Sequence, residues 1–481
     1  MKRLNLLAVA LWLAIGIYGI FYNITYIDEA KYLIKGWLIT TGQVGYYSTP
    51  EFFYQHMPGG LLWYGLGQKL FGPSLLVARF QSFFIGLLII YFTYRLAKTI
   101  KPQAGKLILP VLALSPVAIL YYSSAVPQSL AALTLILGFY NLFKNKNYWA
   151  TFWFTMAFIV RENFLFTLIL YLIYQRHRRL KQLALSLLVI AAFVIPGWPG
   201  ITNVFKNFPG ISWLLPVSGN EKEILSLSFQ QQTHSFSLYL TAAKEFIAIF
   251  FSWLIIMALA ARQPWPKIKH WNFLVAVFCF NFLAHAWSAF NLSPRAIVPY
   301  FAYIAPLASV IASAWLVKTR LKLFWLFPAA ATGLIFASLW QPPGKINTIT
   351  AMNRAAAEIN TLAENKTRTI WIAEPITLYL NGKVSYYPLI NHTNFYKPSN
   401  DTATIKALGF WNQTLLDQWL KEADLLVLDP NRLALAKIEL KPELEANWEK
   451  ITPPATVWPP GLEFYLPKSQ ATTFPDASPS E

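Results

Sequence analysis

The chain is poor in cysteine and in acidic residues, and both shortages exclude classes of protein. Its 481 residues include one cysteine, Cys279, so neither a disulfide within the chain nor a cysteine-rich metal site can form. Asp and Glu total 22, against 40 Lys and Arg. The sequence contains no Ser/His/Asp signature, no zinc motif and no glycine-rich phosphate loop, and the lack of a nucleotide-binding motif argues against an ATP-driven pump.

Hydrophobic residues make up 56% of the chain and aromatic residues 16%. A water-soluble protein of this composition would expose far too much apolar surface. Apolar runs of membrane-spanning length fall at residues 4–22, 76–94, 107–122, 127–143, 183–198, 246–261, 271–290, 296–317 and 323–340.

Two shorter apolar runs, 148–160 and 163–174, flank Arg161 and Glu162. Each is shorter than the roughly 20 residues that an upright crossing needs. We predict that they form a pair of short helices meeting at a polar vertex. With them, the sequence predicts an α-helical polytopic membrane protein of about eleven transmembrane helices.

Basic residues gather in one set of the connections between apolar runs. These connections alternate with the others along the chain, and none contains Asp or Glu. Because cytoplasmic loops are rich in Lys and Arg, we predict that this set is cytoplasmic and that the net charge of +18 reflects topology rather than nucleic-acid binding. Its basic residues are Lys2, Arg3, Arg95, Lys98, Lys101, Lys106, Lys144, Lys146, Arg176, Arg178, Arg179, Lys181, Arg262, Lys267, Lys269, Lys318, Arg320 and Lys322.

The last third of the chain differs in character from the rest, because charges of both signs become common there. Helical patterns at 349–363 and 413–422 alternate with strand-like patterns at 368–373 and 424–428. We predict a transmembrane domain at 1–340, a small extracytoplasmic α/β domain at 341–468, and a disordered tail at 469–481 that is rich in Ser, Thr, Pro and Ala.

The connection at 23–75, which the topology places outside the cytoplasm, holds the most informative motifs. Asp28 and Glu29 follow the first apolar run, in a membrane region where carboxylates are otherwise scarce. A charged side chain at membrane depth is costly, so we interpret these acids as candidate functional residues. The alternative is an interfacial acid pair that caps a helix. Further motifs follow at Lys31-Tyr32, His56-Met57-Pro58-Gly59, Phe71-Gly72-Pro73-Ser74 and Ala78-Arg79.

In combination these motifs resemble the membrane glycosyltransferases of the GT-C class, on the bacterial branch near the protein O-mannosyltransferases and the lipid A aminoarabinose transferases. The resemblance covers roughly the first hundred residues by motif, and the rest of the membrane region by the pattern of Arg161 and Arg295. It implies transfer of a sugar from a polyprenyl-phosphate donor to an acceptor hydroxyl, with inversion. The enzyme would act in the inner or plasma membrane, with its active site facing away from the cytoplasm.

This chemistry needs a carboxylate that takes the acceptor proton, cations that offset the charge of the departing phosphate, and an apolar groove for the isoprenoid. The resemblance implies that Asp28 is the general base and that Glu29 binds the acceptor or holds nearby loops. It also implies phosphate-binding roles for His56, Arg161 and Arg295. The structural alternatives are a turn residue near the interface for His56, an internal ion pair for Arg161, and an interfacial anchor for Arg295.

Two departures from the family pattern bear on the substrate and on metal binding. The Lys-Pro-Pro element of the aminoarabinose transferases is missing, since His56 and Pro58 occupy that stretch, and aminoarabinose therefore loses support as the sugar. Gln128 stands near a point where relatives often carry an acid, so we predict no metal and no cofactor. We interpret His285, which lies within an apolar run, as a hydrogen-bonded packing residue.

The expected partners are the lipid-linked sugar donor, membrane lipids, and an acceptor that is a glycolipid, a polysaccharide or a protein. Two other classes of function stay open. A transporter or lipid flippase should show matching broken helices in two halves, and the sequence has one short-helix pair without a counterpart. A non-catalytic polyprenyl-lipid-binding protein would keep the arginines and tolerate the change Asp28→Asn.

Overall fold

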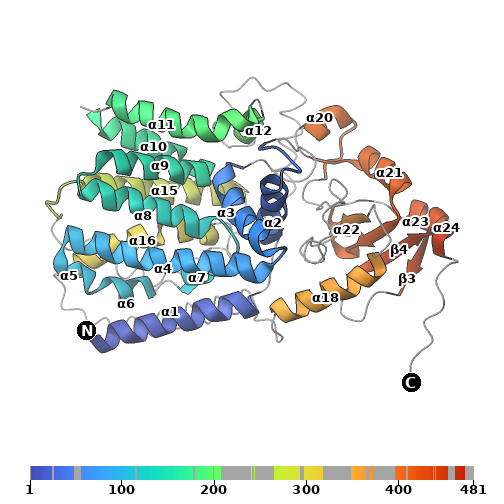
Figure 1. Ribbon diagram of the computed structural model, residues 1–481, viewed down its shortest axis with the longest axis horizontal. Coiled ribbons are helices and arrows are strands. Elements are labelled where there is room, and N and C mark those ends of the chain that lie inside the picture. The colour runs from blue at the N-terminus through green and yellow to red at the C-terminus, as the bar shows by residue number, and fades with distance from the viewer. Residues whose placement is uncertain are drawn as a thin grey trace.

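Helices lie side by side in one half of the computed structural model, and a smaller α/β part forms the other half (Figure 1). The structure describes residues 2–23, 27–47, 56–113, 116–176, 179–198, 200–206, 240, 243, 265–292, 297–317, 348–363, 369–372, 396–407, 410–436, 438, 440–452 and 461–471.

The helical half agrees closely with the apolar runs of the sequence. Its longer helices are α1 (Lys2–Tyr22), α4 (Leu75–Ile100), α8 (Gln128–Phe143), α9 (Asn147–Val160), α10 (Leu165–Tyr174), α11 (Arg179–Val194), α15 (Trp271–Leu292) and α16 (Ile297–Leu316). Its shorter helices are α5 (Pro102–Gly105), α6 (Ile108–Ala113), α7 (Pro116–Tyr121), η1 (Glu162–Phe164), η3 (Ile195–Gly197) and α12 (Ile201–Lys206).

The predicted pair of short helices is confirmed, because α9 and α10 meet at Arg161 and the one-turn helix η1. The predicted span at 107–122 is divided between α6 and α7. The predicted spans at 246–261 and 323–340 lie outside the described residues. The total of about eleven crossings therefore stays a prediction.

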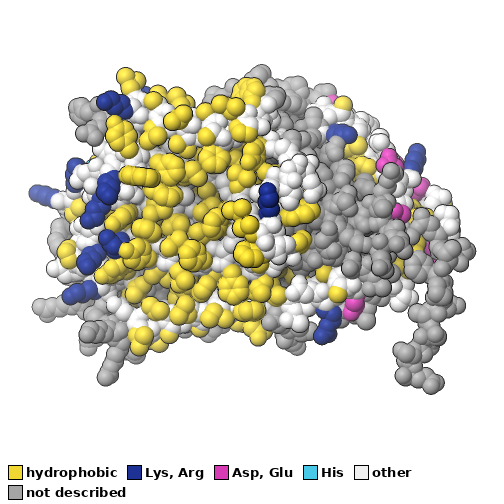
Figure 2. Space-filling model, in the orientation of Figure 1, with side chains coloured by type: hydrophobic (Ala, Val, Ile, Leu, Met, Phe, Trp, Pro, Cys, Tyr) yellow, Lys and Arg dark blue, Asp and Glu magenta, His cyan; other side chains and the backbone are white. Residues whose placement is uncertain are grey.

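The outer surface of the helical half is apolar, and this identifies an integral membrane protein. Among the described residues, three helical segments are long and apolar enough to cross a membrane: Asn5–Tyr22, Leu75–Ile100 and Arg179–Gly197. In the last of these, Leu180 is 80% exposed and Leu188 70%. Figure 2 shows hydrophobic side chains over most of the visible flank of the helices. An apolar surface of this extent is compatible with lipid and not with water.

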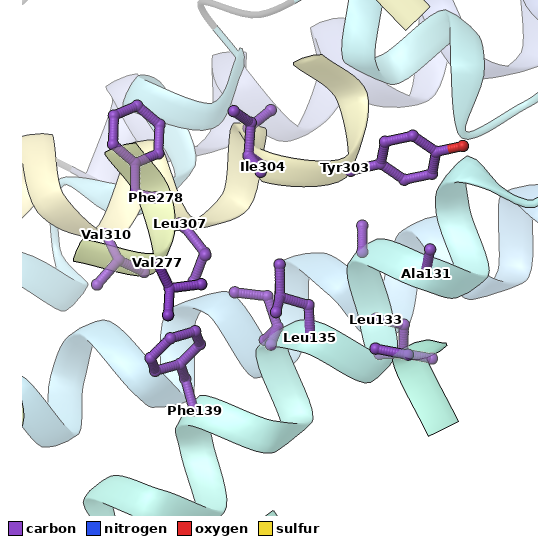
Figure 3. Packing of buried hydrophobic residues seen from close by; sticks show 14 of the residues in the cluster. Ala131, Leu133, Leu135, Phe139, Val277, Phe278, Tyr303, Ile304, Leu307 and Val310 are labelled. Carbon is purple, nitrogen blue, oxygen red and sulfur yellow. The ribbon is translucent and has the colours of Figure 1, made fainter. Parts of the chain in front are cut away.

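Inside the helical half, α8 packs against α15 and α16 through large apolar side chains. Leu135, Phe139, Val277 and Leu307 lie close together in Figure 3 and are almost or fully buried. Lipid tails are as apolar as these side chains, so close van der Waals contact, rather than escape from water, stabilises the packing.

Three of the predicted cytoplasmic connections meet at one end of the helices. Lys269 Nζ donates to Asn145 Oδ1 at 2.6 Å, and the Tyr174 hydroxyl lies 2.7 Å from His270 Nδ1. These contacts join the ends of α8 and α10 to the start of α15. In Figure 2, Lys and Arg side chains gather at the end of the helices that is remote from the α/β part. The grouping of basic loops on one side therefore agrees with the predicted topology.

The predicted first loop contains two helices, α2 (Ile27–Thr40) and α3 (Pro58–Phe71), each 14 residues long. They cross with their backbones almost in contact. A Cβ atom on Gly36 would stand 2.3 Å from Leu61 O, and one on Gly65 would stand 2.1 Å from Gly36 O. The hydroxyl of Thr40 donates to Gly65 O at 3.0 Å across the crossing. Glycine at both positions thus allows α2 and α3 to pack closely at the end of the bundle.

The α/β part contains the predicted elements. Strands β1 (Thr369–Ile372) and β2 (Leu425–Leu428) and helices α18 (Thr348–Ala363) and α21 (Gln413–Glu422) confirm the four predicted segments. The sheet order is β1-β2-β4-β3, with β1 parallel to β2 and the other pairs antiparallel. The remaining elements are α20 (Thr402–Ala407), α22 (Pro430–Ala436), α23 (Lys441–Asn447), β3 (Trp448–Ile451), β4 (Glu463–Pro467) and α24 (Lys468–Ala471).

A single hydrophobic cluster joins this α/β part to the helices of the first loop. It includes Leu33 of α2, Leu61 of α3, Met352 of α18 and Leu426 of β2. Figure 1 shows α2 and α3 between the helical bundle and the α/β part. The predicted boundary at residue 340 and most of the predicted tail lie outside the described residues, so both stay predictions.

Candidate active site

The acid pair stands in the first turn of α2, where the helix N-terminus favours negative charge. The two neighbouring carboxylates have different surroundings. Asp28 is partly exposed, whereas Glu29 is fully buried. Successive helical residues point about 100° apart, so one acid can face a ligand while the other is enclosed by protein.

Glu29 forms a two-pronged ion pair with Arg79 of α4. Arg79 Nη2 lies 2.7 Å from Glu29 Oε2, and its Nε donates to Glu29 Oε1 at 3.0 Å. Both side chains are fully buried. Glu29 Oε1 also accepts from the backbone N–H of Ala125 at 2.7 Å, and Arg79 Nη1 donates to Ile20 O at 2.8 Å. The pair thus fastens together the end of α1, the start of α2, α4 and the turn before α8.

These contacts favour one of the two roles expected for Glu29, that of holding nearby loops. A direct contact between Glu29 and the acceptor stays a prediction. Arg79 belongs to the Ala78-Arg79 motif, for which the sequence predicted no specific role. In the structure it is the buried partner of Glu29.

Arg161 follows the last residue of α9 in an extended backbone conformation. Its Nη1 donates to the hydroxyl of Tyr32 at 2.6 Å, and its Nε donates to the hydroxyl of Tyr303 at 3.1 Å. These phenols come from α2 and α16. The guanidinium is therefore held in a fixed orientation where the first loop meets the bundle.

His56 and Glu162 form a second polar pair beside this guanidinium. His56 Nδ1 lies 2.9 Å from Glu162 Oε1, and the backbone N–H of Met57 donates to Glu162 Oε2 at 3.4 Å. Arg161 Nη1 is 3.8 Å from Glu162 Oε1 and 3.2 Å from His56 Nδ1. The sequence left open an internal ion pair between Arg161 and Glu162, and the structure contains one.

The environment separates the charge states of these two side chains. Burial lowers the pKa of His56 to about 3, helped by the charges of Lys31 and Arg161. Burial alone would raise the pKa of Glu162, but His56 and Arg161 bring it well below its ordinary value. At neutral pH the imidazole is thus uncharged and the carboxylate is ionised.

Asp28 belongs to the same neighbourhood as Arg161. Asp28 precedes Tyr32 by four residues on α2, so the two lie on one face of that helix, and the Tyr32 hydroxyl accepts a hydrogen bond from Arg161 at 2.6 Å. Lys31, one helical turn along from Asp28, feels the charges of Asp28 and Arg161. The convergence of Asp28, Arg161 and Arg295 on one cavity stays a prediction, which the position of Asp28 on the helix that also holds Tyr32 supports.

Two buried lysines on α2 had no role in the sequence interpretation beyond the motif. Lys31 and Lys35 are 6% and 1% exposed. Burial lowers the pKa of Lys31 to about 8 and that of Lys35 to about 7. Their spacing of four residues puts them on one face of the helix. This spacing was the feature of the sequence from which the pair could have been predicted.

His285 is stacked on Tyr300, with ring centroids 4.7 Å apart. Its Nε2 is buried without a hydrogen-bond partner among the described residues. Arg295 lies outside the described residues, so its phosphate-binding role stays a prediction. Nowhere in the described part of the chain do three His, Cys, Asp or Glu side chains gather in a way that could hold a metal ion.

Comparison with known proteins finds no matching family model and no matching curated protein. The fold, however, matches solved structures. The crystal structure of ArnT from Cupriavidus metallidurans bound to undecaprenyl phosphate aligns with a TM-score of 0.56 at 13% identity, over 96% of this chain and 97% of that one. The apo structure of the same protein aligns over the same shares of both chains with a TM-score of 0.45 at 14% identity. The chain therefore has the fold of ArnT almost from end to end, and the predicted resemblance to GT-C membrane glycosyltransferases is confirmed at the level of fold.

Proposed function

We propose that this protein is a glycosyltransferase that moves a sugar from a polyprenyl-phosphate donor to an acceptor hydroxyl on the extracytoplasmic side of the membrane. The observation that supports the proposal is that Arg161 is held between Tyr303 of α16 and Tyr32 of α2, four residues after Asp28 on the same helix. The fold match to an ArnT structure that contains undecaprenyl phosphate supports the class of donor.

In this mechanism the acceptor oxygen attacks the anomeric carbon of the donor sugar. The bond between that carbon and the phosphate oxygen breaks, and polyprenyl phosphate leaves with the bonding electrons. Asp28 takes the acceptor proton, because it is the partly exposed acid of the pair. One displacement of this kind inverts the anomeric configuration.

Arg161 offsets the charge that develops on the leaving phosphate. Its side chain is only 13% exposed, so water screens its charge weakly. Tyr32 and Tyr303 fix the guanidinium before the substrate arrives, which reduces the rearrangement needed in the transition state. Arg295 is the second proposed phosphate ligand.

The direct test compares wild-type protein with the variant Asp28→Asn in membranes that contain equal amounts of each. Transfer of labelled sugar from polyprenyl-phosphate donors should fall roughly 100-fold or more in the variant. Binding of undecaprenyl phosphate should persist, because Asp28 contacts the acceptor rather than the lipid. Lipid-linked sugars should accumulate and surface glycans should change in cells that carry only the variant.

The same experiment separates the two other classes. A non-catalytic lipid-binding protein would bind undecaprenyl phosphate without transferring sugar in either form. A transporter or flippase would move lipid-linked sugar across the membrane and leave its covalent structure unchanged. Equal transfer by wild-type protein and Asp28→Asn would refute Asp28 as the general base.

A further inference from the structure

The two ring nitrogens of His56 have different surroundings. Nδ1 lies 2.9 Å from the carboxylate of Glu162. Nε2 is buried, and no donor or acceptor within the described parts of the chain meets it. The ring itself stacks at 6.0 Å on Tyr32, one of the two phenols that hold Arg161. An unpaired buried nitrogen is costly, so this atom is available to a bound ligand.

Glu162 determines which nitrogen carries the proton. An ionised carboxylate only accepts hydrogen bonds, so the short contact at 2.9 Å requires a hydrogen on His56 Nδ1. Arg161 Nη1, at 3.2 Å, cannot donate to a nitrogen that already carries a proton. In an uncharged imidazole the other nitrogen, Nε2, then presents a lone pair.

This tautomer restricts what the substrate can place at Nε2. Phosphate oxygens that carry no proton are acceptors, and two acceptors repel each other. A hydroxyl group is a donor and fits. We propose that His56 Nε2 accepts a hydrogen bond from a hydroxyl of the bound substrate, and that His56 is a positioning contact for this hydroxyl rather than a phosphate ligand. The inference rests on the proposed function and refines it.

The low pKa of His56, about 3, agrees with this geometry, because protonation of Nε2 would turn the acceptor into a donor. Burial and the charges of Lys31 and Arg161 disfavour that proton and outweigh Glu162, whose charge and hydrogen bond favour it. The guanidinium of Arg161 therefore binds the phosphate, whereas the neutral imidazole of His56 accepts a hydrogen bond from a hydroxyl. This hydroxyl belongs either to the donor sugar or to the acceptor.

Nitrogen NMR of ¹⁵N-histidine protein in nanodiscs tests the tautomer without any change in the site. The chain has six histidines, and the variant His56→Asn assigns the signal. We expect an uncharged ring with the proton on Nδ1 at pH 7. A proton on Nε2, or a charged ring, would overturn the inference whether or not the protein transfers sugar.

Two substitutions test the ligand contact. Asn at position 56 can keep the contact with Glu162 but removes the acceptor at Nε2, whereas Gln places an amide oxygen near the Nε2 position. The probes are undecaprenyl phosphate and the same lipid carrying mannose or glucose. If the hydroxyl belongs to the donor sugar, His56→Asn should weaken binding of the sugar-bearing lipid roughly three- to tenfold relative to the bare lipid, and His56→Gln should restore part of the difference.

If the hydroxyl belongs to the acceptor, both variants should bind the donor normally, and His56→Asn should slow single-turnover transfer from bound donor more than His56→Gln does. Unchanged binding and unchanged transfer in His56→Asn would overturn the inference and leave the proposed function standing. Wild-type protein that binds every probe but transfers no sugar would refute the proposed function, while the NMR result would still report on the tautomer.

Discussion

Tyr32 and Tyr303 hold one guanidinium between them, although 271 positions separate them in the chain (303 − 32). Arg161 donates to the first hydroxyl at 2.6 Å and to the second at 3.1 Å. One phenol belongs to a helix of the first loop and the other to a helix of the bundle. The cation is therefore located by the docking of these two parts of the molecule.

This geometry predicts that Arg161→Ala weakens binding of undecaprenyl phosphate. A charge-assisted hydrogen bond contributes about 1.5–3 kcal/mol, so affinity should fall roughly 10- to 150-fold. The measurement is titration of purified protein in nanodiscs with the lipid.

Arg95→Ala provides the matched control for Arg161→Ala. Arg95 also contacts two tyrosine hydroxyls, those of Tyr91 and Tyr140, but it lies in the last part of α4, among the predicted cytoplasmic connections. Its loss should leave lipid affinity unchanged. Equal affinity of the wild-type protein and Arg161→Ala would contradict the phosphate role.

The buried pair of Glu29 and Arg79 predicts a large loss of stability in Glu29→Gln. The change leaves a fully buried guanidinium without its counter-charge, which costs about 3–5 kcal/mol. The variant should show a clearly lower Tm in detergent. The double variant Glu29→Gln/Arg79→Met should recover part of the loss, because it removes the unpaired charge. A Tm for Glu29→Gln within error of the wild type would show that the pair does not stabilise the fold.

The burial of Lys35 predicts that the stability of the folded protein rises with pH above neutral. Burial lowers its pKa from 10.5 to about 7, so between these values the unfolded chain binds the proton and the folded protein does not. Stability should therefore rise with pH across this window, by at most about 5 kcal/mol. Lys35→Met should flatten the rise of Tm between pH 7 and 10, whereas Lys69→Met, at an exposed position, should not. Identical pH profiles of wild type and Lys35→Met would contradict the burial argument.

The crossing of α2 and α3 predicts that Gly36→Ala damages the site from a distance. The added Cβ would meet backbone at 2.3 Å, and backbone atoms cannot rotate away, so the helices must separate. We expect a loss of about 1–3 kcal/mol together with weaker lipid binding, since α2 carries Asp28 and Tyr32. In Gly105→Ala the nearest atom lies on a side chain at 3.1 Å, and the loss should be smaller. Normal stability and lipid binding in Gly36→Ala would show that the two helices can adjust.

Several features of the fold could be predicted from local sequence. The vertex at Arg161 was predictable because two apolar runs were each too short to cross a membrane. Strand β2 was predictable from its continuous apolar residues between polar flanks. The crossing of α2 and α3 was not, because it depends on glycines 29 positions apart (65 − 36) that come into contact only after folding.

In the candidate site, too, some features were predictable from local sequence and others were not. The motif identified Asp28 and Glu29 as a pair. The local sequence does not predict that Asp28 is partly exposed, whereas Glu29 is buried with Arg79. The family resemblance implied that His56 binds phosphate. Its partner Glu162, which determines the position of the proton, is 106 residues away.

The sequence by itself identified an integral membrane protein and predicted which connections share a side, because the costs of apolar surface in water and of charge in lipid depend on local composition. It also predicted most helices of the bundle and the strands β1 and β2, because their periodicities are local. The tertiary structure decided which polar side chain faces which. Burial and pairing depend on distances between residues that are remote in the chain, and those distances exist only after the helices pack.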